Sequence, residues 1–242
     1  MSSYEYEGRK LPSVTTIIGD CSPKDWGPPW GANMAVEWIR QNCDFNNQFY
    51  HYIVSDDELE SARKNFRDVQ QTALDVGSEV HKAIETFTNI LIKTGNSLDD
   101  YNTYNFIVED LSPQAANSFG AFLEWADANE FVPLESEKTV YSDHWAGTLD
   151  CICMLDGKRT VIDFKSSKAH YLGEHGPQIA AYRSLCEGIE ASGILRLDKE
   201  TGEPDYKDYS KRYEKDLAVF NAMVNLYFLR HPIIARKAGV PF

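Results

Sequence analysis

The spacing of apolar residues changes along the chain from a helical period to a strand-like one. Up to about residue 130, apolar side chains recur every three or four positions, which predicts amphipathic helices over 31–42, 55–69, 72–93 and 113–129. Ser55 and Glu58 form a capping box at the start of the second of these helices. The segment 22–31, rich in Pro, Gly and Trp, predicts a loop, and VTTII at 14–18 fits either a strand or the first turns of a helix.

From residue 131 the apolar residues alternate with polar ones. This pattern predicts strands over 131–142, 145–155 and 159–167, and the Asp156-Gly157 pair predicts a tight hairpin turn between the last two. A helix over 176–186, two short strands within 193–209 and a closing helix over 213–229 complete the predicted elements.

This order of elements predicts an α/β fold, with a central mixed β-sheet flanked by helices and a helical N-terminal lobe. A chain of 242 residues suits a single domain, 1–242. Within it, we expect 1–130 to form the mostly helical lobe and 131–242 to form the sheet core and the closing helix.

Composition narrows the classes of function. The formal net charge of −13 argues against a protein that coats nucleic acid, because such proteins carry a basic stripe. An enzyme that engages a few phosphates through a metal and local cations remains compatible with this charge. The five cysteines include no C-x-x-C pair, so neither a zinc ribbon nor an iron–sulfur cluster is expected. We expect no membrane anchor and no secretion, because no apolar run approaches about 20 residues and the first residues lack the apolar core of a signal peptide.

The predicted hairpin carries charged residues where its strands should be apolar. Asp150 lies in the first strand and Asp163 in the second, while Lys165 shares a face with Asp163. Burying such charges is costly unless they are paired or bind a metal, and converging carboxylates repel unless a cation lies between them. Oxygen ligands of this kind suit Mg²⁺ or Mn²⁺, and the carbonyl of Phe164 is a further candidate ligand. Lys165 could orient or deprotonate an attacking water, or stabilise charge on a phosphate.

Three sequence segments, in this order, resemble the RecB-like branch of the PD-(D/E)xK nuclease superfamily. They are G-x-x-x-H-x-x-x-E over 77–85, G-x-x-D followed by D-x-K in the hairpin, and Q-x-x-x-Y over 178–182. The opening LPSVT and the LDC…GK…VID-x-K pattern of the hairpin are similar to the mitochondrial genome maintenance exonucleases and to phage and bacterial exonucleases like them. The relatives of this branch that carry a four-cysteine iron–sulfur cluster have a spacing that this chain lacks.

The resemblance implies a restriction-endonuclease-like core and a role for each matching residue. The catalytic and metal-binding residues would be His81, Asp150, Asp163, Phe164 (through its carbonyl) and Lys165. Gln178 and Tyr182 lie on one face of a helix, where they would hold the active site and contact the DNA backbone.

Five residues with hydroxyl or ammonium groups are weaker candidates for binding DNA. Ser13, Thr15 and Thr16 could hydrogen-bond the DNA backbone without reading sequence, although strand propensity also explains them. Ser166 and Lys168 could contact a phosphate or belong to a solvated loop.

Two glutamates and three tryptophans have comparable alternatives. Glu85 could fix the orientation of the histidine ring or pair with a nearby lysine on the surface. Glu137, which we favour over the neighbouring Glu135, could reach the site or be an edge-strand charge. Trp26 and Trp30 could stack on the bases of a single strand, whereas Trp38 suits core packing.

Together these patterns lead us to expect a Mg²⁺- or Mn²⁺-dependent DNA exonuclease that prefers single-stranded or frayed ends. A structure-specific endonuclease of the same fold, or a non-catalytic DNA-binding or recombination scaffold, are the alternatives. We expect DNA as the partner, with a recombination or replication protein as a further candidate partner, and the cytoplasm of a bacterium or phage-infected host as the location.

Overall fold

The computed structural model describes residues 3–22, 27–95 and 107–240. The chain divides into two compact units, one formed by 1–22 with 77–242 and the other by 23–76. The division falls inside one helix, α3 (Asp56–Thr94), so the helical segment expected over 1–130 is shared between the two units.

The observed elements follow most of the predicted periods. The larger unit contains β1 (Ser3–Tyr6), β2 (Arg9–Pro12), α1 (Val14–Cys21), the remainder of α3, α5 (Pro113–Ala128), β5 (Val132–Tyr141), β6 (Ala146–Leu155), β7 (Lys158–Lys165), α6 (Leu172–Ser184), β8 (Ala191–Leu197), β9 (Pro204–Asp208), η1 (Ser210–Arg212), α7 (Tyr213–Arg230) and α8 (Pro232–Lys237). The smaller unit contains α2 (Gly27–Asn42), β3 (Asp44–Asn46), β4 (His51–Ile53) and the first part of α3. Within the described ranges, no helix has both the length and the hydropathy needed to cross a lipid bilayer.

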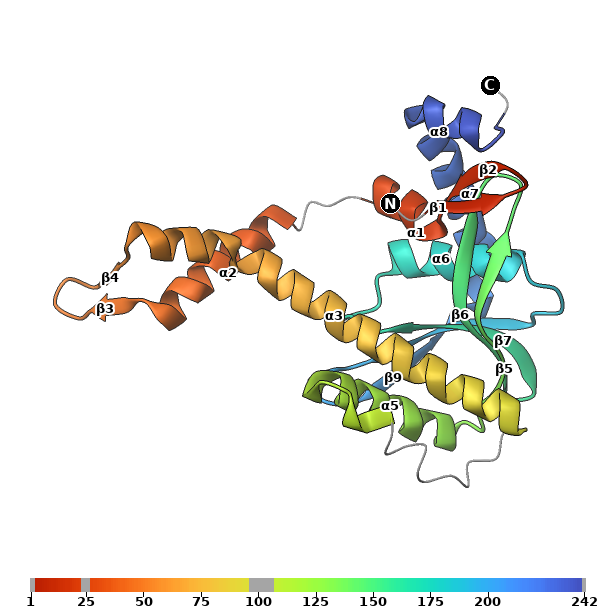
Figure 1. The fold of residues 1–242 in the computed structure, drawn as a ribbon, viewed down its shortest axis with the longest axis horizontal. Helices are drawn as coiled ribbons and strands as arrows, with labels where there is room; N and C mark the ends of the chain where they lie inside the picture. The colour runs from red at the N-terminus through yellow and green to blue at the C-terminus, as the bar shows by residue number, and fades with distance from the viewer. Residues whose placement is uncertain (1–2, 23–26, 96–106, 241–242) are drawn as a thin grey trace. The chain divides into compact units, whose positions relative to one another are not determined.

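A five-stranded sheet in the order β5-β6-β7-β8-β9 forms the centre of the larger unit (Figure 1). β7 and β8 are parallel, with α6 as their crossover, and the other neighbouring strands are antiparallel. The sheet is therefore mixed and flanked by helices, which confirms the predicted fold class. The predicted tight turn joins β6 to β7, where Asp156 and Gly157 have φ angles of 49° and 71°, as a type I′ turn requires.

The two faces of β7 point into different layers of the larger unit. Phe164 packs against Phe122 of α5, with ring centroids 5.5 Å apart, whereas the neighbouring Asp163 accepts a hydrogen bond from Gln178 of α6. Since successive side chains of a strand alternate, α5 and α6 cover opposite faces of the sheet, as Figure 1 shows. Phe87 of α3 packs edge-on against Phe122 and so joins the α5 layer.

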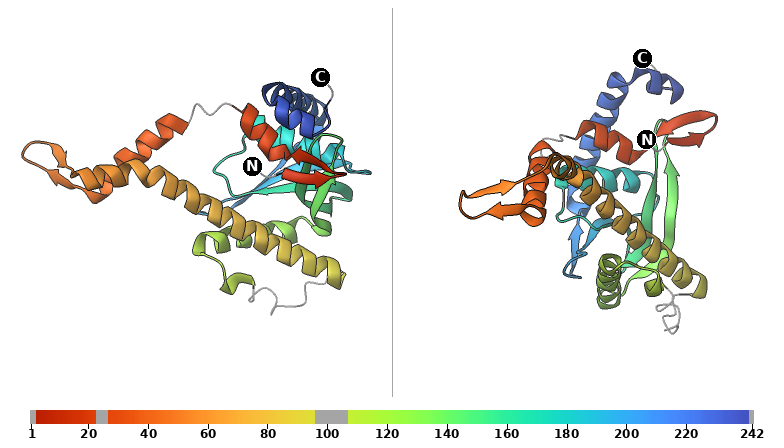
Figure 2. Two further views of the ribbon diagram at one scale, coloured as in Figure 1. Left: turned by 45° about the horizontal axis from the view of Figure 1, so that its top comes forward. Right: turned by 60° about the vertical axis from the view of Figure 1, so that its left-hand side comes forward.

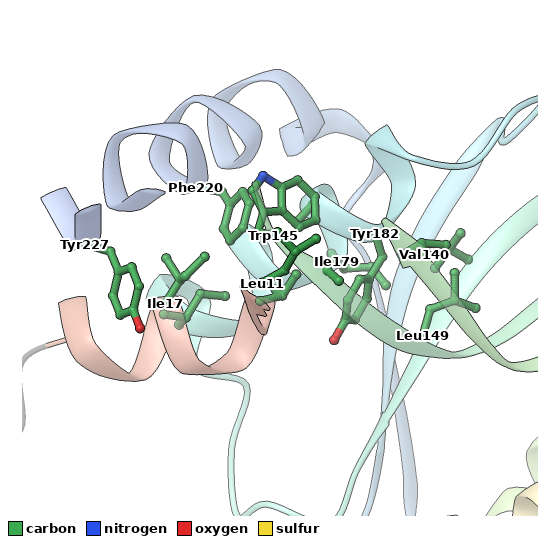
Figure 3. Close-up of a cluster of buried hydrophobic side chains, with 14 of the residues drawn as sticks. Leu11, Ile17, Val140, Trp145, Leu149, Ile179, Tyr182, Phe220 and Tyr227 are labelled. Atoms are coloured by element: carbon green, nitrogen blue, oxygen red, sulfur yellow. The ribbon is translucent and has the colours of Figure 1, made fainter. Parts of the chain in front are cut away.

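The largest hydrophobic cluster lies on the α6 side of the sheet. There α1 lies beside α7, and both helices contact α6 (Figure 2). Figure 3 shows Ile17, Phe220 and Tyr227 in this cluster together with Trp145, whose ring meets that of Phe220 edge to face at 4.9 Å. Each large apolar side chain buried in this way contributes about 1.5–3 kcal/mol, so the cluster holds α6 firmly against the sheet.

The smaller unit is built differently. Trp30 of α2 meets Phe66 of α3 edge to face, with ring centroids 6.2 Å apart, and Asn65 donates a hydrogen bond to the carbonyl of Met34. No residue of α2 is fully buried, and Trp38, expected in a core, is only half-buried. The apolar side chains of this unit therefore remain partly open to solvent.

Two local predictions are wrong. The predicted loop over 22–31 ends early, because α2 begins at Gly27 and accommodates Pro28 and Pro29 in its first turn, where a missing N–H costs little. The helices predicted over 55–69 and 72–93 are one helix, since the two residues between them are glutamines and no Gly or Pro separates them.

Candidate functional site

Three neighbouring strands place three carboxylates in one row. The β5–β6 register sets Glu137 opposite Asp150, and the β6–β7 register, continued by one residue, sets Asp150 opposite Asp163. The Cβ atoms of residues opposite one another on antiparallel strands are about 5 Å apart, and like charges in such positions repel. The row is therefore unfavourable unless positive charge lies beside it.

His81 brings positive charge to this row from α3. Its Nδ1 atom lies 3.5 Å from Oδ1 of Asp150. The potential ligand atoms of His81, Glu137 and Asp150 all lie within 4.8 Å of one another. Attraction to the Asp150 carboxylate raises the pKa of His81 to about 9 despite partial burial of the ring, so the ring of the metal-free chain is an imidazolium at neutral pH.

Asp150 is held in position by the backbone of the next strand. The amide of Phe164 donates a hydrogen bond of 2.7 Å to Oδ2 of Asp150. Burial opposes ionisation of Asp150, but His81, Lys165 and this amide outweigh burial and lower the pKa of the carboxyl. The carboxyl group of Asp150 is therefore ionised at neutral pH. Within the described residues, only the amide of Phe164 is seen to contact the site, so the role of its carbonyl as a metal ligand stays a prediction.

Asp163 and Lys165 form a buried pair on β7. The ammonium of Lys165 lies 2.7 Å from Oδ2 of Asp163, whose side chain is only 2% exposed. Burial raises the pKa of Asp163 to about 6, more than the attraction of Lys165 lowers it. Burial also disfavours the charged form of Lys165, but Asp163 and Asp150 outweigh it and raise the pKa of the ammonium. Lys165 therefore keeps its proton and cannot readily act as a base.

Glu137 has a backbone conformation that is unusual inside a strand. Its φ angle is 49°, in the left-handed region, which costs a non-glycine residue about 1 kcal/mol or more. Burial and the charge of Asp150 raise the pKa of Glu137 to about 7. Strain and a perturbed pKa at one residue are typical of functional positions. Glu135, by contrast, pairs with Arg159 and Lys138 away from this row.

The helix α6 supports the site through Gln178 and Tyr182. Gln178 Nε2 donates to Oδ1 of Asp163 at 2.9 Å and lies 3.5 Å from the Tyr182 hydroxyl. Both side chains are buried, and burial of Tyr182 raises the pKa of its hydroxyl. Gly147 explains the first position of the G-x-x-D motif, because a Cβ atom there would lie 2.6 Å from the Tyr182 ring.

The other candidates occupy less central positions. Glu85 pairs with Lys82 at 2.9 Å, which matches its surface alternative. Ser13 is buried and caps α1, accepting a hydrogen bond from the Thr16 amide, so VTTII is helical. Thr15 is the exposed hydroxyl of this group.

The loop after β7 carries the predicted phosphate contacts. Ser166 and Lys168 line a hollow of about 250 Å³ together with Lys199. A Cβ atom at Gly77 of α3 would lie 3.2 Å from Oγ of Ser166, so this glycine lets the helix approach the loop. Contact with DNA at Ser166 and Lys168 stays a prediction, and Trp26 lies outside the described residues.

A contact without any motif links α3 to the sheet. The buried Thr88 hydroxyl donates a hydrogen bond of 3.0 Å to Oγ of Ser136, the residue before Glu137. Thr88 lies two turns beyond His81 on the same helix, so this bond fixes the helix beside the strand that carries Glu137. The only sign of this contact in the sequence is a threonine among the apolar residues of a helix face. Such a threonine does not reveal which residue its hydroxyl contacts.

The donor set fits a divalent cation. One imidazole and several carboxylates suit Mn²⁺ or Mg²⁺, and a cation beside the row would relieve repulsion that the chain otherwise offsets with His81 and Lys165. No protein-family model matches the chain, and no curated protein matches it significantly.

Proposed function

We propose that the chain is a metal-dependent deoxyribonuclease that hydrolyses phosphodiester bonds at single-stranded or frayed DNA ends. The observation that carries the proposal is the row of Glu137, Asp150 and Asp163 across three strands, with His81 and Lys165 beside it. A binding scaffold has no evident use for this charge arrangement, whereas cleavage of a phosphodiester does.

Each residue has a role that follows from its contacts. His81, Glu137, Asp150 and Asp163 would hold Mg²⁺ or Mn²⁺, with the Phe164 carbonyl as a further ligand. When bound, such an ion polarises the scissile phosphate and lowers the pKa of a coordinated water.

Lys165 acts beside these ligands as a permanent positive charge. Its raised pKa favours stabilising the negative charge that develops on the phosphate over removing a proton from water. Gln178 holds Asp163 through its hydrogen bond, and Tyr182 supports Gln178.

The choice of substrate and of end-directed digestion comes from the resemblance to exonucleases of the RecB-like branch. We place the activity in the cytoplasm, where the free cysteines would remain reduced. A structure-specific endonuclease is the closest alternative that uses the same residues.

The test uses end-labelled single-stranded and duplex oligonucleotides with Mg²⁺ or Mn²⁺. Asp163→Ala and Lys165→Ala should each abolish cleavage while leaving the circular dichroism spectrum unchanged. Lys158→Ala is the matched control, because Lys158 is exposed at the other end of the same strand. This variant should cleave DNA like the wild type. Turnover at the wild-type level in either site variant would contradict the mechanism.

A second arm separates exonuclease from endonuclease. Circular single-stranded DNA should resist digestion under conditions that degrade linear DNA of the same sequence. Equal rates on both would identify an endonuclease, and no metal-dependent cleavage of any DNA would leave a binding scaffold as the better explanation.

A further inference from the structure

The smaller unit contains a groove of about 570 Å³ between α2 and the first part of α3. Its lining includes Trp30 and Phe66, the small residues Gly31 and Ala35, and the guanidinium-bearing Arg63. This volume lies within the range of about 300–1,000 Å³ that is typical of pockets for organic ligands. Trp30 and Phe66, whose rings meet edge to face, both line this groove and are both half-buried.

Cations gather at the edge of this groove on an otherwise acidic chain. Arg63, Lys64 and Arg67 lie within five consecutive residues of α3, whereas the whole chain has a formal net charge of −13. The guanidinium carbon of Arg67 lies 5.5 Å from the centre of the Phe66 ring. Glu60 lies 3.5 Å from Arg63 and 3.7 Å from Lys64, so one carboxylate is shared by two of these cations.

We infer that this groove binds unpaired bases of single-stranded DNA. The bases stack on Trp30 and Phe66, and the adjoining phosphates meet Arg63 and Arg67. Aromatic platforms beside cationic side chains are the combination that binds single strands without reading their sequence. The choice of ligand rests on the proposed function, but the groove and its contacts do not involve the carboxylate row.

An amphipathic helix of a partner protein could also cover an apolar groove. The pairing of aromatic rings with guanidinium groups favours a base and its phosphate, since a helix would need mainly aliphatic surface. Failure of the groove to bind single strands in the experiment below would favour the protein partner and overturn the inference.

The experiment measures fluorescence anisotropy of a labelled oligothymidylate with the full chain in EDTA, so that no cleavage occurs. Trp30→Ala and Arg67→Gln should each weaken binding about tenfold, as expected for loss of a stacked base or a phosphate contact. Phe49→Ala and Arg40→Gln are matched controls, because they remove an exposed aromatic ring and an exposed cation of the same unit outside the groove. They should bind like the wild type.

Salt dependence distinguishes the two kinds of contact. Arg67→Gln should reduce the slope of log K against log salt by about 0.7, whereas Trp30→Ala should leave the slope unchanged. Glu60→Gln should strengthen binding, because it frees two cations, and it should do so more than Glu37→Gln, which removes a carboxylate paired with Arg40.

The results separate this inference from the proposed function. Groove variants that bind like the wild type would overturn the inference even if the wild type cleaves DNA. A wild type that cleaves no DNA, but binds it through the groove, would overturn only the nuclease proposal. Where circular dichroism shows that Trp30→Ala is unfolded, the exposed charge variants at Arg63 and Arg67 decide the question.

Discussion

Binding of a metal at the carboxylate row should release protons, and the number released should depend on how far the ligands are protonated beforehand. In the metal-free chain His81 is protonated at pH 7, because its pKa is about 9, and Glu137, with a pKa of about 7, is half protonated. A metal binds the deprotonated imidazole and carboxylate. Binding of one Mn²⁺ at pH 7 should therefore release about one and a half protons, about one from His81 and about half from Glu137.

Calorimetric titration of Mn²⁺ in buffers with different ionisation enthalpies measures this number. The release should fall toward about one proton at pH 8, where Glu137 is ionised, and should exceed about two protons at pH 6, where Asp163 with its pKa of about 6 also contributes. His81→Gln should lower the release at pH 7 by about one proton and Glu137→Gln by about half a proton. A release that does not vary with pH, or that His81→Gln leaves unchanged, would refute this reasoning.

The same pKa values predict how stability depends on pH. Folding raises the pKa values of both His81 and Glu137, so each of these two groups stabilises the fold when it is protonated. The contribution of His81 is complete below about pH 6.5 and is lost as the pH rises through about 9, and that of Glu137 is lost as the pH rises through about 7. The melting temperature of the metal-free chain should therefore fall between pH 5 and pH 9, while the increase caused by Mn²⁺ should grow. The matching control is His81→Gln, in which the fall between pH 8 and pH 9 should be largely absent while the fall caused by Glu137 remains.

Three further substitutions test how the site is supported. Lys165→Met leaves the buried carboxylate beside it unpaired and should cost about 3 kcal/mol of unfolding free energy in urea at pH 8, but less at pH 5, where the carboxyl can take up a proton. Gly147→Ala places a methyl group 2.6 Å from the Tyr182 ring and should cost about 1–3 kcal/mol in the same assay. Thr88→Val breaks the 3.0 Å bond to Ser136 and should weaken Mn²⁺ binding in calorimetry, whereas Thr88→Ser should preserve it.

The hairpin and the relative placement of its charged side chains could be predicted because the relevant signals are local. The Asp156-Gly157 turn fixes the pairing of two adjacent strands, and a period of two then determines which side chains share a face. The pairing of Asp163 with Lys165, and the spacing of Gln178 and Tyr182 on one helix face, follow from the same short-range geometry.

The other features of the site and of the fold could not be predicted, because they depend on contacts between segments that are distant in the sequence. The position of Glu137 opposite Asp150 requires the β5–β6 register, which includes an irregularity between Pro133 and Glu135 that no period reveals. Thr88 and Ser136 are 48 residues apart, and no motif connects them. The division of the chain inside α3 was also not predicted, because the helix continues through the boundary between Val76 and Gly77, and a single glycine inside a helix does not by itself mark the end of a unit.

Proton exchange explains how a sheet can contain a row of carboxylates and still accept a divalent cation. Without a metal, the positive charges of His81 and Lys165 offset Asp150, Asp163 and a half-ionised Glu137, so the site is close to neutral. If metal binding expels about one and a half protons, the net charge of the site rises by only about half a unit. The folded chain therefore avoids a large buried charge in both states, and metal affinity becomes a function of pH. Because every proton that must leave has a pKa between about 6 and about 9, metal affinity should rise most steeply across this range, and with it any activity that requires the metal.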